Sequence, residues 1–389
     1  MKQKWSTDMI KDTEIKYVTY ELGELLSYEQ PTPYIVESTD YNDTYKTPVL
    51  TAGKSFILGY TNEENNIYNE LPVIIFDDFT TASRYVNFPF KVKSSAMKIL
   101  TPNTELVIPK YIFYRMQIIE FDHSTHKRYW IQQYSRIKVT IPPITEQQRI
   151  VDRIEELFSQ LESAVETLQK TKQQLAVYRQ AVLKEAFENC SDNSKEDLIQ
   201  SVCSNIVDCP HSTPKWVDSG KLCLRTTNFK RGYLDLTEKN YVSEETFNIR
   251  NARLIPLPGD VLYSREGAIL GIACIIPKDT YVCLGQRMML FRTNERMNGR
   301  FLMHYLNSPR VTSYVTTITG GSASPHINVG DIKNFKVPVP SITQQEFMLE
   351  QLEAKLSVCD NIEKTVDTAL RQAEAMRQSI LKKAFEGKL

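Results

Sequence analysis

The sequence predicts a mixed α/β protein in which two globular domains are separated by two long antiparallel coiled-coil helices, arranged as a pseudo-twofold internal repeat. Three observations support this prediction. The chain has 389 residues, more than one ordinary hydrophobic core accommodates. A segment of 48 residues recurs later in the chain, and each copy carries the apolar spacing of a long helix. The segments before the two copies contain short, turn-bounded apolar runs typical of strands.

The composition is that of a globular protein, with 41% hydrophobic and 24% charged residues, and no apolar run approaches the length of a membrane span. The first ten residues contain lysines but no apolar core or small-residue cleavage site. No secretory signal or membrane contact is therefore predicted, and a cytoplasmic location is expected. All seven cysteines lie after residue 189 without a Cys-x-x-Cys pair, which favours reduced, mostly buried thiols over disulfides or a zinc site.

Charge is distributed unevenly along the first domain. The whole chain has 47 basic and 47 acidic residues and a formal net charge of zero. Residues 1–83 carry 6 Lys/Arg and 14 Asp/Glu, a net charge of −8, whereas residues 84–138 carry 10 and 3, a net charge of +7. A local basic face can attract phosphate even in a neutral protein, so nucleic acid remains a possible ligand.

The internal repeat is the strongest signal in the sequence. Residues 141–188 align without a gap to residues 339–386 at an offset of 198, and 15 of the 48 positions are identical. Each copy opens with a proline-bearing extended segment, followed by a threonine, Thr145 or Thr343, that can cap a helix. A helix is therefore expected to begin at the same point of each copy.

Both copies carry a heptad pattern typical of one helix packed along another. Alternate steps of four and three from Ile150, and from Met348 in the second copy, meet apolar residues at 9 of 11 positions each. Roughly forty helical residues would span about 60 Å, and ordinary amphipathic core helices are less favoured because they seldom exceed about 25 residues. The residues expected in the seam between the helices are Ile150, Ile154, Leu157, Leu161, Leu168, Leu175, Tyr178, Val182, Leu352, Ile362, Val366, Met376 and Ile380.

These features divide the chain into a domain at residues 1–141, a helical segment at 142–190, a second domain at 191–339 and a second helical segment at 340–389. Strands are predicted in the first domain at residues 72–76, 106–108 and 136–141. In the second domain they are predicted at residues 253–255, 260–263, 272–276 and 288–292.

Several motifs resemble those of the specificity subunits of type I restriction-modification enzymes, and the resemblance covers nearly the whole chain. In that family each target-recognition domain precedes a helical region introduced by a Pro-Pro-Leu/Ile and Glu-Gln-Gln signature. This chain has PPITEQQ at residues 142–148 and a degraded copy, PSITQQE, at residues 340–346. The second domain resembles one type of recognition domain through TTN at 226–228, GDVLYSREG at 259–267, Gln286 and HIN at 326–328. The first resembles a different type, with QPTPY at 30–34, LTAGKS at 50–55 and FDDFTT at 76–81.

The resemblance implies a DNA-reading subunit without catalytic activity. It implies two modification subunits that bind S-adenosylmethionine and methylate adenine, and restriction subunits that use ATP and Mg²⁺, with no cofactor on this chain. Two unlike recognition domains imply an asymmetric, bipartite target on double-stranded DNA.

A search for catalytic motifs gives a consistent answer. The Asn/Asp-Pro-Pro-aromatic motif of amino-methyltransferases is absent, because Pro142-Pro143 is followed by Ile144. Gly53-Lys54-Ser55 lacks the earlier glycine of a phosphate-binding loop, since Pro48 stands there.

Two further segments, one with adjacent aspartates and one with two histidines, are also better explained by structural roles than by catalysis. Asp77 and Asp78 have no downstream Glu-x-Lys in their domain, so a structural pair is favoured over a nuclease centre. His123 and His126 bring too few ligands for a metal, so a basic loop is favoured. No catalytic residue and no metal site is predicted. The alternatives are a helical adaptor whose two domains bind ligands other than DNA and a stand-alone DNA-modifying enzyme.

DNA contact needs Arg or Lys for phosphate and guanine, Asn or Gln for adenine, and hydroxyl or aromatic side chains in support. A third to a half of such candidates are expected to touch DNA, mostly at phosphates. The candidates in the first domain are Lys54, Arg84, Tyr85, Lys91, Lys93, Lys127, Arg128, Tyr129, Gln132 and Gln133. Those in the second are Lys215, Arg225, Thr226, Asn228, Lys230, Arg231, Arg265, Gln286, Arg287 and His326.

Overall fold

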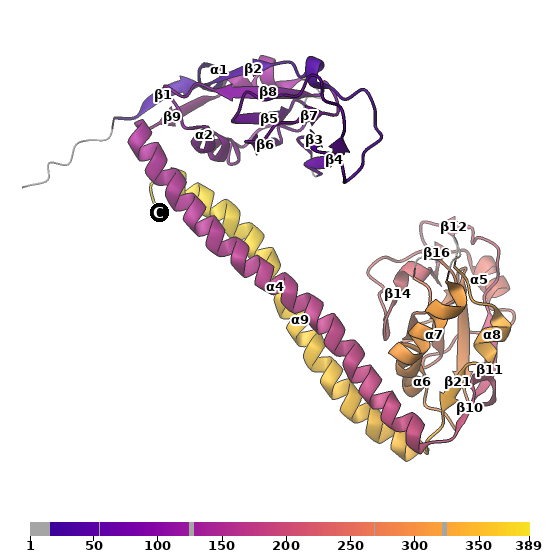
Figure 1. The fold of residues 1–389 in the computed structure, drawn as a ribbon. Helices are drawn as coiled ribbons and strands as arrows, with labels where there is room; N and C mark the ends of the chain where they lie inside the picture. Colours follow the sequence, from indigo (N-terminus) through magenta and orange to yellow (C-terminus); the bar gives the residue numbers. More distant parts are fainter. Residues whose placement is uncertain (1–15, 54, 124–127, 268, 321–324) are drawn as a thin grey trace, which may run out of the picture. The chain divides into compact units, whose positions relative to one another are not determined.

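The computed structural model describes residues 16–53, 55–123, 128–267, 269–320 and 325–389. The chain folds into two compact units. Unit 1 comprises the chain up to Thr167 together with Ala369–Leu389, and unit 2 comprises Leu168–Thr368. Each unit therefore contains one α/β domain and parts of both long helices (Figure 1).

Besides the antiparallel two-stranded pair β1-β9, unit 1 contains two small sheets. One has the strand order β2-β8-β5-β6 and is antiparallel, and the other has the order β4-β3-β7 with β3 and β7 parallel. Its elements are β1 (Val18–Glu21), α1 (Leu22–Leu25), β2 (Leu26–Glu29), η1 (Thr32–Tyr34), β3 (Thr47–Leu50), β4 (Ile57–Thr61), β5 (Val73–Asp77), β6 (Ser83–Val86), β7 (Lys91–Val92), β8 (Met97–Pro102), α2 (Pro109–Met116), α3 (Tyr129–Gln132), η2 (Tyr134–Arg136) and β9 (Lys138–Ile141).

Strand β5 explains how unit 1 builds two cores. Side chains alternate across a strand. Ile74 and Phe76 enter the cluster shared with α2 and the helix pair, whereas Val73 and Ile75 enter the cluster under β3 and β7. The continuous apolar run that predicted this strand is therefore buried on both faces.

Unit 2 has a larger α/β domain with two four-stranded sheets, in the orders β11-β20-β17-β18 and β12-β16-β13-β19. Its elements are β10 (Glu196–Leu198), η3 (Ile199–Ser201), β11 (Cys203–Asp208), β12 (Trp216–Val217), β13 (Lys221–Leu224), η4 (Thr226–Asn228), β14 (Phe229–Lys230), β15 (Tyr233–Leu234), β16 (Tyr241–Val242), α5 (Glu244–Arg250), β17 (Val261–Ser264), β18 (Ala273–Ile275), β19 (Cys283–Leu284), β20 (Met288–Thr293), α6 (Gly299–Leu306), α7 (Pro309–Thr319), α8 (Val329–Lys333) and β21 (Lys336–Pro338).

Most of the predicted strands are present within one or two residues, but two are wrong. Residues 106–108 form a turn instead, because the N–H groups of Leu106 and Val107 donate to the carbonyl of Asn103 at 3.1 and 2.9 Å. Residues 253–255 form no strand either, and Ile255 is 60% exposed. Short apolar runs cannot distinguish a strand from a turn that covers a core.

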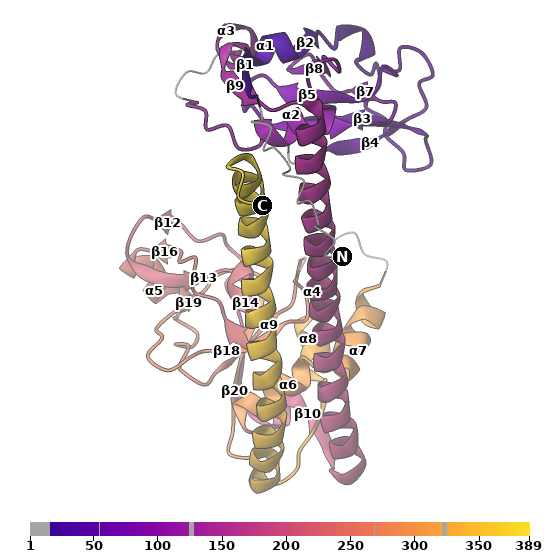
Figure 2. The same ribbon diagram turned by 90° about the vertical axis from the view of Figure 1, so that its left-hand side faces the viewer.

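The two long helices are α4 (Ile144–Asn193) and α9 (Ile342–Phe385). In unit 1 the start of α4 lies beside the end of α9, and in unit 2 the end of α4 lies beside the start of α9 (Figures 1 and 2). The helices are therefore antiparallel, as predicted. Helix α4 continues past the expected boundary at residue 190, whereas α9 ends before residue 389.

The structure buries some of the residues predicted for the seam and exposes others. Ile150, Ile154, Leu175, Val182, Leu352 and Val366 are buried, and Leu157, Leu161, Leu168 and Ile380 are half-buried. Tyr178, Ile362 and Met376 are 51, 40 and 54% exposed, so their assignment to the seam is wrong.

The arginines that follow Tyr178 and Met376 in the sequence form ion pairs between the two helices. Arg179 and Asp360 form an ion pair of 2.6 Å in unit 2, and Arg377 and Glu162 form one of 3.4 Å in unit 1. These two pairs occupy equivalent positions of the repeat. The guanidinium of Arg377 also lies 4.3 Å from the ring centroid of Phe158.

A glutamine at the start of each helix makes the same contacts in both units. The Gln147 side chain is fully buried; it accepts from the N–H of Ile108 at 2.8 Å and donates to the carbonyls of Leu106 and Pro142 at 3.1 and 2.9 Å. The fully buried Gln345 repeats this set, with Asn298 N–H at 2.8 Å and the carbonyls of Arg296 and Pro340 both at 2.9 Å.

The helix ends also dock on the domains in the same way. Phe385, near the end of α9, packs its ring 5.2 Å from that of Tyr111 on α2. Phe187, near the end of α4, packs 5.2 Å from Phe301 and 5.3 Å from Tyr305 on α6. Since Phe187 and Phe385 are equivalent in the repeat, each domain is held by the start of one helix and the end of the other.

The seven cysteines form no disulfide; six are buried and Cys203 is half-buried. Burial raises the pKa of the Cys203 thiol to about 12. Among the helices in the described ranges, none has an apolar stretch of the length that a membrane span requires.

Candidate nucleic-acid interface

Four loops of unit 2 that are distant in sequence meet at one edge of its domain. They follow β11, follow β17, join β19 to β20, and precede α8. The N–H of Arg265 donates to the carbonyl of Arg287 at 3.0 Å, and the N–H of Ile327 donates to the carbonyl of Arg265 at 2.9 Å. The Gln286 amide donates to the carbonyl of His211. The motifs at residues 264–267, 286–287 and 326–328 are therefore parts of one surface.

Arg265 is the structural centre of these loops. Its side chain is 7% exposed and donates to the Asp208 carboxylate at 2.9 and 3.2 Å, while Glu266 lies 2.7 Å away on its other side. His211, which sequence reasoning missed, lies 3.0 Å from the same Asp208 carboxylate and is 68% exposed. The prediction that Arg265 contacts DNA is not supported, because two carboxylates neutralise its buried guanidinium.

Asn228 is a second predicted contact with a structural role. Its side-chain oxygen accepts from the N–H of Arg225 at 2.9 Å, and its amide donates to the carbonyls of Asp235 and Glu238, both at 3.0 Å. The residue is 4% exposed. Its amide therefore holds the turn that presents Arg225 and is not free to read adenine.

The other candidates in unit 2 remain accessible. The exposed ones are Lys215, Arg225, Lys230, Arg231, Arg287 and His326, and the half-buried ones are Thr226 and Gln286. The guanidinium of Arg225 lies 5.6 Å from the ring centroid of Trp216, which is 40% exposed. An aromatic ring paired with an exposed cation suits contact with a nucleotide. Trp216 itself was not predicted as a contact, and the only sequence signal near it was the adjacent candidate Lys215.

Arg250, another residue that the sequence did not single out, fixes two of the four loops from below. It is 6% exposed and donates to the carbonyls of Leu284 at 2.6 Å and Gly285 at 2.7 Å. It also donates to the carbonyls of Pro210 and Ser212, both at 3.1 Å. One buried guanidinium thus ties the loop after β11 to the turn before β20.

In unit 1, polar segments from three parts of the first domain meet around Asp78. Its N–H donates to the carbonyl of Ala96 at 3.1 Å, and its own carbonyl accepts from the N–H of Tyr129 at 2.9 Å. Its buried carboxylate accepts from the N–H of Trp130 at 2.8 Å and lies 3.3 Å from the buried ammonium of Lys98. The end of β5, the start of β8 and α3 are joined here, so Asp78 is a structural residue, as expected.

The first-domain candidates divide by burial. Lys93, Arg128, Gln132 and Gln133 are exposed, and Arg84 and Tyr85 are half-buried. Lys54 and Lys127 lie outside the described residues. The predictions for Lys91 and Tyr129 are not supported, because Lys91 is 3% exposed and pairs with Glu63 at 2.7 Å, and Tyr129 is 1% exposed.

The aspartate and histidine segments considered above as possible catalytic or metal sites make structural contacts. The Asp77 carboxylate accepts from the N–H groups of Phe79 and Thr80, both at 2.9 Å, and so shapes the turn after β5. His123 lies 2.9 Å from the Thr81 hydroxyl, and His126 lies outside the described residues. Across the described parts of the chain, no three His, Cys, Asp or Glu side chains gather as a metal site.

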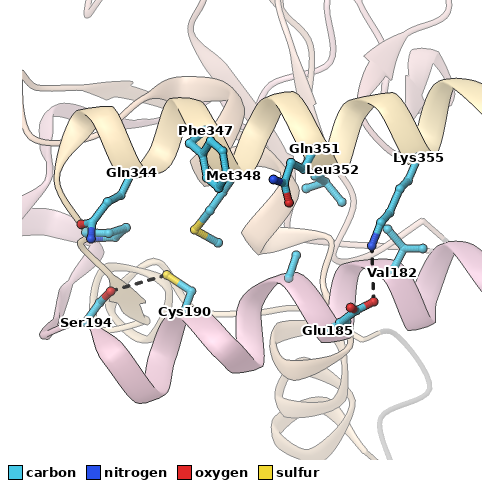
Figure 3. Close-up of a pocket in the computed structure, with 12 residues that line it drawn as sticks. Val182, Glu185, Cys190, Ser194, Gln344, Phe347, Met348, Gln351, Leu352 and Lys355 are labelled. Atoms are coloured by element: carbon cyan, nitrogen blue, oxygen red, sulfur yellow. Dashed lines mark hydrogen bonds and ion pairs between the residues drawn. The ribbon is translucent and has the colours of Figure 1, made fainter.

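A groove of about 320 Å³ lies between the end of α4 and the start of α9 in unit 2 (Figure 3). Val182, Met348 and Leu352 line it, and the Lys355–Glu185 ion pair of 3.6 Å crosses it. Its lining comes mainly from the helix pair and includes none of the DNA-contact candidates. The groove is therefore separate from the polar loop surface of the same unit.

Two α/β domains, each docked on a helix pair and each presenting clustered polar loops, define a modular recognition protein. The chain matches the family described as "Type I restriction modification DNA specificity domain" at residues 14–174 and 220–372. It therefore belongs to the specificity subunits of type I restriction-modification systems, which recognise DNA sequence.

Individual relatives agree with this assignment. The type I restriction enzyme EcoR124I/EcoR124II specificity subunit of Escherichia coli is 32% identical over 378 residues, which cover 92% of each chain. The type I restriction enzyme MjaVIII specificity subunit of Methanocaldococcus jannaschii is 23% identical over 398 residues, covering 95% of this chain and 92% of that one.

A solved structure shares the fold. A chain from "Structural basis underlying complex assembly and conformational transition of the type I R-M system" superposes with a TM-score of 0.69. The match covers 96% of this chain and 98% of that chain, at 17% identity.

Proposed function

We propose that this specificity subunit reads an asymmetric, bipartite target on double-stranded DNA and directs adenine methylation and DNA restriction by partner subunits. The observation that carries the proposal is a contrast within the two units. The contacts that attach each domain to the helices are the same, whereas the polar loops proposed to contact DNA differ. Gln147 and Gln345 make matching contacts to their domains, whereas the polar loops around Asp78 and around Arg265 share no common plan. The same attachment with different readers suits two different half-sites.

The chain itself supplies binding without chemistry. The carboxylates of Asp77, Asp78, Asp208 and Glu266 are all engaged in turns or ion pairs. Each therefore has a structural role that accounts for its position. An enzyme that modifies DNA needs a nucleophile, a base or a metal next to the substrate, and the residues of these loops instead offer donors suited to phosphates and base edges.

The partners follow from the family. Two modification subunits would bind S-adenosylmethionine and transfer the methyl group, and restriction subunits would use ATP and Mg²⁺. The relatives carry the name of type I restriction enzymes, and the solved structure concerns assembly of a type I system. Because the substrate is genomic DNA, we place the assembly in the cytoplasm.

A domain exchange tests the proposal. Residues 194–339 begin after α4 and contain both strands of the β10–β21 pair, so they can be replaced as a block by another recognition domain of the family. In cells with the modification partner, sequencing of methylated adenines should show one changed half-site and one unchanged half-site. The matched exchange replaces the first domain, residues 1–141, which ends with β9. It should change the other half-site and leave the one read by unit 2 unchanged.

Two outcomes would contradict the proposal. An exchange that altered both half-sites would refute independent readers. Absence of salt-dependent, sequence-specific DNA binding by the parent assembly would favour the helical adaptor for other ligands, because phosphate contacts make DNA affinity depend on salt.

A further inference from the structure

We propose that Arg287 is a base-reading residue of unit 2 and recognises a guanine in the half-site bound by this unit. The inference rests on the proposed function, and it assigns one specificity-determining residue within it. Arginine is suited to this role because its two parallel N–H groups match the O6 and N7 acceptors of guanine in the major groove.

The backbone of Arg287 is held in a strained conformation. Its φ of 67° lies in the left-handed region, which costs a residue with a side chain and is rare outside glycine and asparagine. Such strain persists where surrounding contacts determine it and marks candidate functional positions. Here the carbonyl of Arg287 accepts from the N–H of Arg265 at 3.0 Å, and Met288 begins β20 immediately afterwards.

The turn that presents Arg287 is rigid on its other side as well. A Cβ at Gly285 would lie 2.2 Å from the carbonyl oxygen of Leu224, so the turn is packed tightly against β13. The buried Arg250 donates to the Gly285 carbonyl at 2.7 Å, and the Gln286 amide donates to the carbonyl of His211. A turn whose backbone is already fixed loses little freedom on binding, which favours specific over merely electrostatic contact.

Of the two arginines described on these four loops, Arg265 and Arg287, the local charges leave Arg287 available. Arg265 is neutralised by Asp208 and Glu266, at 2.9 and 2.7 Å. Arg287 is exposed and has no ion pair among the residues that the structure describes. Its Nη1 atom lies 3.5 Å from the point where a Cβ on Gly267 would stand, so the side chain extends over the loop after β17.

The left-handed backbone also provides a clean variant. Arg287→Gly removes the guanidinium and relieves the strain, so it should fold at least as well as the parent. Arg287→Lys keeps the charge but loses the paired donors, and so separates base contact from phosphate contact. Lys278→Gly, in the exposed turn after β18, is the control for removing one positive charge from the same domain.

The experiment uses the full chain assembled with its modification subunit and a DNA duplex carrying the methylation target mapped in cells. Each guanine of the half-site read by unit 2 is replaced in turn by 7-deazaguanine, which lacks the N7 acceptor. The parent should lose about tenfold to a hundredfold in affinity at one position. Arg287→Gly and Arg287→Lys should lose a similar factor on unmodified DNA and lose nothing further at that position, whereas Lys278→Gly should behave as the parent.

Several results would overturn the assignment. They are a half-site without guanine, losses that multiply when variant and modified base are combined, and an Arg287→Lys protein with full affinity. The last result would make Arg287 a phosphate contact. A parent assembly that binds no specific sequence would refute the proposed function itself, and the assignment would fall with it.

Discussion

Glutamine is the side chain that satisfies the site at the start of each long helix. The position needs one acceptor for a buried N–H and two donors for buried carbonyls, and the amide of Gln147 supplies all three. Glutamate would place its oxygens against the two carbonyls, and an apolar residue would leave all three backbone groups without a partner. The identity of Gln147 and Gln345 in the repeat therefore reflects a shared structural requirement.

Replacing Gln147 with Leu should lower the free energy of unfolding of unit 1 by about 2 to 4 kcal/mol, because buried backbone groups lose their partners. The neighbouring Gln148 is the matched control, since its exposed side chain donates only to Asp152 at 2.7 Å. Gln148→Leu should change stability by less than about 0.5 kcal/mol. Urea denaturation of the two variants measures both effects, and equal losses would show that the buried amide contributes nothing special.

His304 introduces a pH dependence into unit 2 at a position where unit 1 has Tyr114. Its ring Nε2 lies 3.3 Å from the Glu353 carboxylate, and Tyr114 makes the equivalent contact to Glu155 at 3.4 Å. Burial, with a smaller contribution from Arg300, lowers the pKa of His304 to about 4. Because a carboxylate only accepts, the neutral ring must carry its proton on Nε2.

The stability of unit 2 should therefore fall as the pH drops from 6.5 towards 4. In that range the unfolded chain binds a proton at His304 and the folded chain does not, whereas above pH 6.5 the ring is neutral in both states. His304→Tyr, which copies the residue at position 114, should reduce the loss between pH 7 and 4.5 by about 2 kcal/mol. Urea titrations at several pH values test this, and parallel curves for parent and variant would contradict it.

Residue type alone could not separate readers from supports in the candidate site. Lys91 and Arg265 have the same chemistry as exposed DNA-binding residues, but each is neutralised by a carboxylate far away in sequence, Glu63 or Asp208. His211 and Arg250 carried no local signal at all. Their roles depend on loops brought together by the fold, which a single sequence does not reveal.

At the scale of the element, the long helices were predictable because their signal is local and repeated over many turns. Their detailed seam was not. A straight helix drifts about 20° per heptad relative to a strict 3.5-residue repeat, so the four heptads from Ile150 to Tyr178 accumulate about 80°. The next residue, Arg179, then faces the partner helix and pairs with Asp360 at 2.6 Å. Met376 and Arg377 show the same displacement in the second copy.

The shortest strands, unlike the long helices, could not be predicted from the sequence. β12, β14 and β19 have two residues each, too few for any periodic pattern. β19 exists because Cys283 and Leu284 pair in parallel with Cys223 and Leu224, far away in sequence. Such elements follow from the tertiary fold and could not be predicted beforehand.

The corrected seam predicts how α9 responds to a buried charge. Ile362→Lys should change stability by less than about 0.5 kcal/mol, because the residue is 40% exposed on the outer face. Val366→Lys should cost about 3 kcal/mol or more, since Val366 is 5% exposed and the charge would lose its hydration. Thermal or urea unfolding measures the stability of the two variants. Similar losses of stability for both would indicate that Ile362 lies in the seam, as the strict heptad pattern predicts.

At the scale of the molecule, the repeat keeps the attachments constant and varies the readers. Arg179–Asp360 and Arg377–Glu162 occupy equivalent positions, as do the ion pairs of Lys110 with Glu155 and of Arg300 with Glu353. Each ion pair lies within one unit. A change at the boundary between the units should consequently leave both sets of internal contacts intact.

Lengthening both helices at this boundary should lengthen the DNA spacer between the half-sites. Four helical residues inserted after Thr167 in α4 and after Thr368 in α9 add about 6 Å of rise, or roughly one to two base pairs at about 3.4 Å each. They also turn each helix by about 40° beyond a full turn, a modest displacement of the seam. The half-site bases should not change, because neither recognition domain is altered. Methylation motifs of parent and insert measure the spacing, and an insertion in α4 alone is the control that should disturb the helix register. Unchanged spacing in an active double insert would show that the helices do not set the spacing, and altered half-site bases would show that the insertion reaches a recognition domain.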